Sequence, residues 1–75
     1  MHLESIWEFV TFSQYMNFSK AAKKLYMSQS LLSRHIANLE KELGFKLVER
    51  EGTLRLTAAG ARYLSWAEQI GRAHV

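Results

Sequence analysis

Apolar residues recur along this chain at helical spacing, interrupted by short polar segments, and the pattern predicts four helices. The first is predicted over residues 3–14, from the repeat of Leu3, Ile6, Val10 and Ser13. Asn17 then offers a side-chain oxygen that can cap a second helix, residues 18–25. Ala21 and Ala22 on that helix are small. We therefore expect another helix to pack closely against it.

The third predicted helix, residues 29–43, has two sharply different faces. Ser28 is its expected N-cap, and Gly44 ends it because glycine adopts the left-handed conformation without a Cβ penalty. One face carries an apolar stripe of Leu32, Ile36, Leu39 and Leu43. The opposite side carries Ser30, Arg34, Ala37 and Lys41, with Ser33 and Asn38 on the flanks. Small polar groups and one arginine beside a buried stripe suit the DNA major groove, so residues 18–37 are interpreted as a helix-turn-helix.

Two short strand patterns follow, over residues 46–50 and 53–57, around a turn that contains Gly52. They predict a β-hairpin, which beside a helix-turn-helix is called a wing. Thr57 is the expected N-cap of a fourth helix, on which Leu64, Ala67 and Ile70 repeat at every third position. The predicted fold class is mainly α: a winged helix-turn-helix with a three-helix core and a short β-hairpin wing, followed by a further helix.

Composition narrows the classes of protein to which the chain can belong. Its 75 residues suffice for one small domain, and a hydrophobic fraction of 48% excludes a disordered tail. Its apolar runs are far shorter than the ~20 residues that cross a bilayer, and the N-terminus lacks a signal-peptide pattern. There is no cysteine, and therefore no disulfide or thiolate metal site. We expect a cytoplasmic domain without membrane contact.

The positive charge is concentrated in the middle of the chain. Residues 18–57 hold eight basic and four acidic residues, whereas residues 1–17 hold two acidic residues and no lysine or arginine. The excess of positive charge lies where the helix-turn-helix is predicted, which favours a polyanionic partner such as nucleic acid. An ordinary solvated surface can show the same bias.

Catalytic and metal chemistry find no support in the sequence. The chain has no aspartate, and no serine, histidine and carboxylate form a recognisable catalytic set. The histidines, which lack the spacing of a metal site, are His2, His35 and His74. We expect no enzyme activity, no metal and no cofactor. His35 is expected on the surface or facing DNA, and residues 40–42 on a solvated face of the third helix.

The order of elements and a set of motifs resemble the DNA-binding domain of the LysR-type transcriptional regulators, over residues 3–64. The matching residues are Phe9, Phe18, Ala21-Ala22, Leu25, Ser28-Gln29, Ser33-Arg34, Ile36, Leu39-Glu40, Leu43-Gly44, Leu47, Arg50, Leu56-Thr57 and Ala59-Gly60. The resemblance implies sequence-specific binding of double-stranded DNA by part of a ligand-responsive transcription regulator. It also implies that the fourth helix begins a linker helix, through which a homodimer or higher homo-oligomer forms. A small-molecule effector would bind only a separate C-terminal domain.

The chain departs from the family pattern at two informative places. The family usually has Gly-Ser where this chain has Met16-Asn17. Since Asn17 can still cap, the expected loss is slight. Family members commonly carry a basic residue near the tip of the wing, whereas this turn carries the acidic Glu51. The sequence therefore gives less reason to expect this wing to contact the minor groove than in those family members.

Resemblance and helix geometry together assign the base-contacting residues to Gln29, Ser30, Ser33 and Arg34. An arginine can donate two hydrogen bonds to guanine, and a glutamine can pair similarly with adenine. The alternatives are that Gln29 and Ser30 only cap the helix and that Arg34 forms an exposed ion pair. Two contacts stay open for Leu31: it can meet a thymine methyl group of the DNA, or it can pack on the second helix.

Phosphate contacts are expected from Lys20, Lys24, Ser28, Arg50 and Arg55. Ser28 would act at the start of the third helix, where free N–H groups can hold a phosphate. A dimer seam is expected from Trp7, Leu64, Trp66 and Ile70. The alternative for the two tryptophans is that they complete the small core.

The expected domain covers residues 1–58, and residues 59–75 form the start of a truncated linker helix. The last six residues, IGRAHV, break the helical pattern at Gly71 and match a translated sequencing adapter. We interpret residues 70–75 as non-native, so that the natural protein would continue. Two other hypotheses stay open: a winged helix used for protein–protein contact, and a fragment without function because it cannot dimerise.

Overall fold

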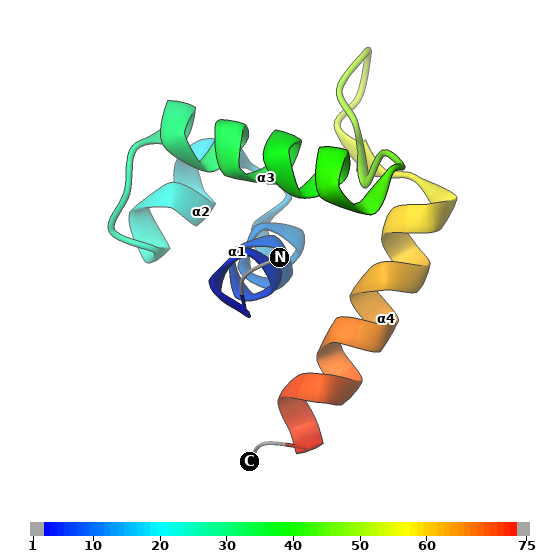
Figure 1. The fold of residues 1–75 in the computed structure, drawn as a ribbon. Coiled ribbons are helices and arrows are strands. Elements are labelled where there is room, and N and C mark those ends of the chain that lie inside the picture. The colour runs from blue at the N-terminus through cyan, green and yellow to red at the C-terminus, as the bar shows by residue number, and fades with distance from the viewer. Residues whose placement is uncertain (1–2, 74–75) are drawn as a thin grey trace.

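The computed structural model describes residues 3–73, and the side chains of residues 3–71. Within that range the elements are α1 (Leu3–Tyr15), α2 (Phe18–Lys24), α3 (Gln29–Leu43), β1 (Val48–Glu49), β2 (Arg55–Leu56) and α4 (Ala58–Ala73). The first three helices pack on one another, and α4 packs against α1 and extends away from α3 (Figure 1). The predicted fold class, a mainly α winged helix-turn-helix, is confirmed.

The predicted helix ends are confirmed by their capping geometry. The side-chain oxygens of Asn17, Ser28 and Thr57 each accept a hydrogen bond from the backbone N–H three residues later, at 2.9, 3.1 and 2.8 Å. Gly44 ends α3 with a φ of +83°. The predicted break at Gly71 is wrong, because α4 continues through it to Ala73. These caps fix where α2, α3 and α4 begin.

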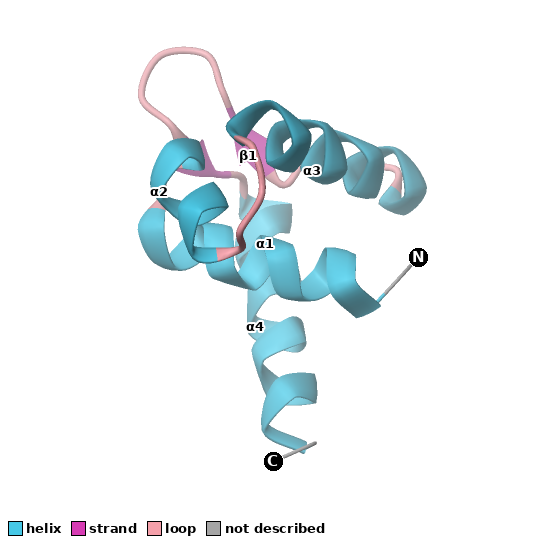
Figure 2. Ribbon diagram, turned by 90° about the vertical axis from the view of Figure 1, so that its left-hand side faces the viewer, coloured by secondary structure: helices cyan, strands magenta, loops and turns pink. Residues whose placement is uncertain are grey.

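The hairpin is shorter than predicted. Only residues 48–49 and 55–56 pair as antiparallel strands, in the register Val48↔Leu56 and Glu49↔Arg55 (Figure 2). The flanking backbone is held in another way, since the Thr57 hydroxyl donates to the Lys46 carbonyl oxygen at 2.6 Å. On the side facing α3, the N–H groups of Leu47 and Val48 donate to the carboxylate of Glu40 instead of to another strand.

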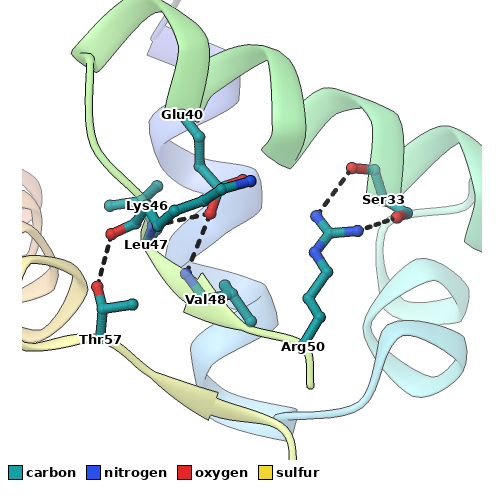
Figure 3. Close-up of polar contacts among 7 residues, drawn as sticks. All are labelled: Ser33, Glu40, Lys46, Leu47, Val48, Arg50 and Thr57. Atoms are coloured by element: carbon teal, nitrogen blue, oxygen red, sulfur yellow. Dashed lines mark hydrogen bonds and ion pairs between the residues drawn. The ribbon is translucent and has the colours of Figure 1, made fainter.

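Glu40, expected on a solvated face, is buried, and that expectation is wrong. Its side chain is only 5% exposed. The Oε2 atom accepts hydrogen bonds from the N–H groups of Leu47 at 2.8 Å and Val48 at 3.1 Å (Figure 3). A carboxylate at the end of α3 thus supplies the acceptors that a neighbouring strand would otherwise offer, and it anchors the start of the hairpin to α3.

The core lies between α1, α3 and the base of the hairpin. Its fully buried large side chains are Phe9, Phe12, Leu32, Ile36, Leu39 and Leu47. The repeat that predicted α1 marks its buried side only in part, because Leu3 is 68% exposed while Phe12 is completely buried. The ring of Phe12 lies 4.4 Å from that of Phe18 between centroids, which places the start of α2 against the buried side of α1. On α4, burial raises the pKa of the Tyr63 hydroxyl, with a further contribution from Glu42.

Two residues other than glycine adopt positive φ angles at the turns around α2. Met16 has a φ of +47° and Tyr26 a φ of +56°. The departure from Gly-Ser at residues 16–17 is therefore more costly than expected. Asn17 caps as predicted, but Met16 adopts the conformation that suits glycine best. Met16 recovers part of this cost because its side chain packs against the core.

Tyr26 has no such compensation, and replacing it with asparagine should stabilise the protein. The side chain is 97% exposed, so little packing is lost. The left-handed conformation costs ordinary residues about 1–2 kcal/mol, and asparagine tolerates it best after glycine. We expect Tyr26→Asn to raise the free energy of unfolding by about 1 kcal/mol in urea denaturation followed by circular dichroism. The control Tyr15→Asn, at the last residue of α1, should lower it; equal effects at both positions would contradict the explanation.

Candidate nucleic-acid interface

The four predicted base-contacting residues lie together on the first two turns of α3. Gln29, Ser30 and Arg34 are exposed, and Ser33 is half-buried. Among the described residues no ion pair is found for Arg34, so the alternative of an exposed ion pair has no support. Ser28, rather than Gln29, supplies the capping oxygen, and the Ser30 hydroxyl lies 3.5 Å from that of Ser28. Gln29, Ser30 and Arg34 are therefore exposed to a partner.

The start of α3 also carries the general anion site of a helix. The first N–H groups of any helix have no partner within the helix, and the helix dipole is positive there. The Ser28 hydroxyl accepts from the Leu31 N–H. The N–H groups that precede Leu31 at the start of α3 are directed away from the helix. Leu31 itself is half-buried. This end of α3 can therefore receive a phosphate oxygen next to the exposed polar edge.

The lysine and arginine residues predicted to contact phosphate fall into two groups. Lys20 and Lys24 are exposed on α2, and Arg55 is exposed on β2. In Figures 1 and 2, α3 and the hairpin lie at the end of the molecule away from the C-terminal end of α4. Arg50 differs from the other three, because it is engaged within the protein.

Arg50 connects the hairpin to both helices of the helix-turn-helix. Its Nη1 donates to the Ser33 hydroxyl oxygen at 2.6 Å, and its Nη2 donates to the Ser33 carbonyl oxygen at 3.3 Å (Figure 3). Its guanidinium carbon lies 5.0 Å from the centre of the Phe18 ring, within the range of a cation–π contact. The sequence motifs singled out Ser33 and Arg50 separately. Their contact spans 17 positions along the chain, and no local pattern predicted it.

His35, expected on the surface or facing DNA, instead turns toward α1, so the expected DNA-facing position is wrong. Its Nδ1 lies 3.0 and 3.2 Å from the two carboxylate oxygens of Glu8, and the pair is partly buried. His35 borders the apolar stripe of α3, because it is next to Ile36 and three positions after Leu32. This position in the sequence could have indicated that His35 contacts the neighbouring helix. The pair joins α1 to α3 behind the exposed edge.

The predicted dimer-seam residues divide between a surface groove and the core. The side chains of Trp7 and Trp66 are 59% and 47% exposed, so neither completes the core. Trp7 and Ile70 line one apolar groove between α1 and α4. Trp66 packs on Tyr63 with 5.5 Å between ring centroids. Leu64 packs against the core instead.

The described residues contain no group of three or more histidine or acidic side chains arranged to hold a metal ion. His2 and His74 lie outside the described residues. Within residues 3–73, none of the helices combines the length and the apolar character needed to cross a membrane.

A family model described as a bacterial regulatory helix-turn-helix protein of the lysR family matches residues 3–61. The chain is 43% identical over 71 residues to the HTH-type transcriptional regulator CitR of Bacillus subtilis, covering 93% of this chain and 24% of that protein. It is 41% identical over 70 residues to a probable nitrogen assimilation transcriptional activator of Synechococcus elongatus, covering 93% and 23%. The chain spans about a quarter of the length of these relatives.

Solved structures give the same assignment. A BenM DNA-binding domain in complex with catB site 1 DNA superposes with a TM-score of 0.93 at 36% identity, covering 97% of this chain and 80% of that one. A CbnR DNA-binding domain in complex with DNA gives a TM-score of 0.90 at 33% identity, covering 99% and 86%. Full-length BenM gives 0.89 at 36% identity, covering 97% and 24%. The chain belongs to the LysR family of bacterial regulators and is the winged helix-turn-helix DNA-binding domain of a transcription regulator.

Proposed function

We propose that this domain recognises a specific sequence in double-stranded DNA by placing the start of α3 in the major groove. The observation that carries the proposal is the exposed edge of Gln29, Ser30 and Arg34, which no other described element covers. Arg34 would donate to O6 and N7 of a guanine, and Gln29 would pair with an adenine. Ser30 is short enough to reach a base edge or a phosphate without filling the groove.

The basic side chains around α3 would hold the DNA without selecting its sequence. Lys20, Lys24 and Arg55 are exposed on two elements that flank α3. Lysine and arginine contacts to phosphate fix the register of a protein on the duplex but carry no sequence information directly. The N–H groups around Ser28 would add one phosphate contact at the helix start.

We further propose that two copies act together, through the faces of α1 and α4. Large exposed aromatic side chains are typical of an interaction surface, and Trp7 on α1 and Trp66 on α4 are such residues here. Ile70 extends the apolar groove beside Trp7, while Leu64 supports the surface from the core side. This surface lies away from α3, so two α3 helices remain free to enter successive major grooves about 34 Å apart.

The whole protein would be a ligand-responsive regulator that acts in the cytoplasm. The relatives from Bacillus subtilis and Synechococcus elongatus are transcriptional regulators about four times as long as this chain. We propose that a small-molecule effector binds a C-terminal domain beyond these residues, and that α4 joins the two parts.

A pair of substitutions tests the assignment of roles. Arg34→Ala should reduce the preference between an enriched and a scrambled duplex by about 1–3 kcal/mol, because a bidentate guanine contact is lost. Lys20→Ala should weaken binding to both duplexes equally and reduce the salt slope by about one. Fluorescence anisotropy across a salt series measures both effects, starting from duplexes selected from a random pool.

Four outcomes would contradict the proposal. Unchanged preference in Arg34→Ala would remove its base-contacting role, and a sequence-selective effect of Lys20→Ala would remove its phosphate role. Binding that hardly depends on salt would favour a winged helix used for protein contact, since phosphate contacts release counterions. Enriched sequences should be inverted repeats; single half-sites would contradict the two-copy arrangement.

A further inference from the structure

The hydrogen bonds from Arg50 restrict how the Ser33 hydroxyl can meet DNA. A serine hydroxyl has one O–H donor and two acceptor lone pairs. Arg50 Nη1 donates to one of those lone pairs at 2.6 Å, so the hydroxyl hydrogen remains available. A charged donor also polarises the O–H bond and makes it a stronger donor in turn. Ser33 is thus prepared to donate to an acceptor such as O6 or N7 of guanine, or a phosphate oxygen.

The guanidinium group can do this because three elements fix its orientation. The guanidinium carbon lies over the Phe18 ring at the start of α2, and Ser33 on α3 accepts from its two Nη atoms. Its backbone follows β1, whose Val48 N–H is bound to Glu40 of α3. A lysine in the same place would supply the charge, but its ammonium group has neither the planar fork nor the flat face for stacking.

We propose that Arg50 is a positioning residue for DNA recognition, which holds the Ser33 hydroxyl as a hydrogen-bond donor toward an acceptor on the DNA. The inference rests on the proposed sequence-specific function of α3. It differs from a simple phosphate contact, because a phosphate contact requires only positive charge. Positioning requires the two forked donors of an arginine, held over the Phe18 ring.

Arg50→Lys separates the two roles because it keeps the charge. The probes are the duplex most enriched by the wild-type chain from a random pool and a scrambled duplex of the same composition. We expect Arg50→Lys to reduce the ratio of the two affinities by about tenfold, equivalent to about 1.4 kcal/mol. The slope of affinity against salt should remain unchanged, since the charge is kept. Arg62→Lys, at an exposed position on α4, is the matched control and should keep the wild-type ratio.

A double-substitution cycle shows whether Arg50 acts through Ser33. Ser33→Ala should reduce the ratio by a similar factor, and adding Arg50→Lys to it should reduce the ratio little further. Independent, multiplying losses would overturn the proposal. Circular dichroism melting curves establish that each variant is folded, as expected for changes at the protein surface.

A second measurement needs no DNA and no change at Arg50. In ¹H–¹⁵N spectra of the free chain, Ser33→Ala should shift the guanidinium resonances of Arg50 and speed their exchange with water. Unchanged resonances would overturn the proposal even if Arg50→Lys failed to fold. An Arg50→Lys chain with the wild-type affinity ratio would overturn positioning alone. A wild-type chain that bound both duplexes equally would overturn the proposed function and this inference together.

Discussion

Replacing Gly60 with alanine should lower the free energy of unfolding by about 3 kcal/mol or more, the upper range for overpacking a close contact. Gly60 lies in the first turn of α4, directly against the base of the hairpin. A Cβ atom there would overlap the Leu47 carbonyl oxygen and lie 2.9 Å from its carbonyl carbon. These are backbone atoms, so no side-chain rotation can relieve the overlap.

The backbone at Leu47 has little freedom to move away. Its N–H donates to the buried carboxylate of Glu40, and its carbonyl oxygen accepts from the Thr57 N–H at 3.0 Å. The Leu47 side chain is completely buried in the core. Alanine at residue 60 must therefore separate α4 from the hairpin or break one of these contacts.

Gly71 on the same helix provides the control. A Cβ atom there meets nothing within 4 Å. Since glycine inside a helix is less stable than alanine by about 0.5–1 kcal/mol, Gly71→Ala should stabilise the chain by that amount. Urea denaturation followed by circular dichroism measures both variants. The explanation by close approach would be refuted if Gly60→Ala were as stable as the wild type.

Replacing Glu40 with alanine should cost about 3 kcal/mol of stability, because two buried backbone N–H groups lose their acceptor. Leaving one buried polar group unsatisfied costs about 1–3 kcal/mol. The carboxylate accepts from Leu47 and Val48, and all three groups are buried. The ion pair with Lys46 contributes little, since its atoms are 4.0 Å apart and the lysine side chain is exposed.

Neighbouring substitutions distinguish this effect from a general change in α3. Glu40→Gln keeps a side-chain oxygen acceptor and should lose less stability than Glu40→Ala. Lys41→Ala, at the next and exposed position, should change stability by about 0.5 kcal/mol or less. Hydrogen exchange at the Leu47 and Val48 amides should quicken in Glu40→Ala. Unchanged exchange at both amides would show that the carboxylate does not hold the hairpin.

These two residues show where prediction from sequence stopped. Both belong to motifs that the resemblance picked out, Leu39-Glu40 and Ala59-Gly60, but the residue types alone did not state their roles. A glutamate near a helix end looks like a solvated charge, and a glycine in a first helical turn looks replaceable. Glu40 acts across seven positions to Leu47, and Gly60 acts across 13. Contacts between elements that meet only on folding decided both roles.

The helix starts, their caps and the apolar stripe of α3 were determined by the sequence itself. They depend on hydrogen bonds and side-chain spacing between residues three or four positions apart, such as the bond from Asn17 to the turn that follows it. The exposed edge at Gln29 and Arg34 followed from the same periodicity, because a helix that buries one stripe must present the other. The recognition helix was therefore predictable in position and in face.

Only the tertiary structure decided the partners of the polar side chains. Arg50 reaches Ser33 because the hairpin folds back over α3, and His35 reaches Glu8 across 27 positions because α1 crosses behind that helix. Which side of α1 is buried was likewise decided by packing, since Phe12 contacts Phe18 of α2 and Phe9 contacts Tyr63 of α4. Helical periodicity is a local property of the chain, whereas the partner of a long polar side chain depends on which elements the core brings within a few ångströms of each other.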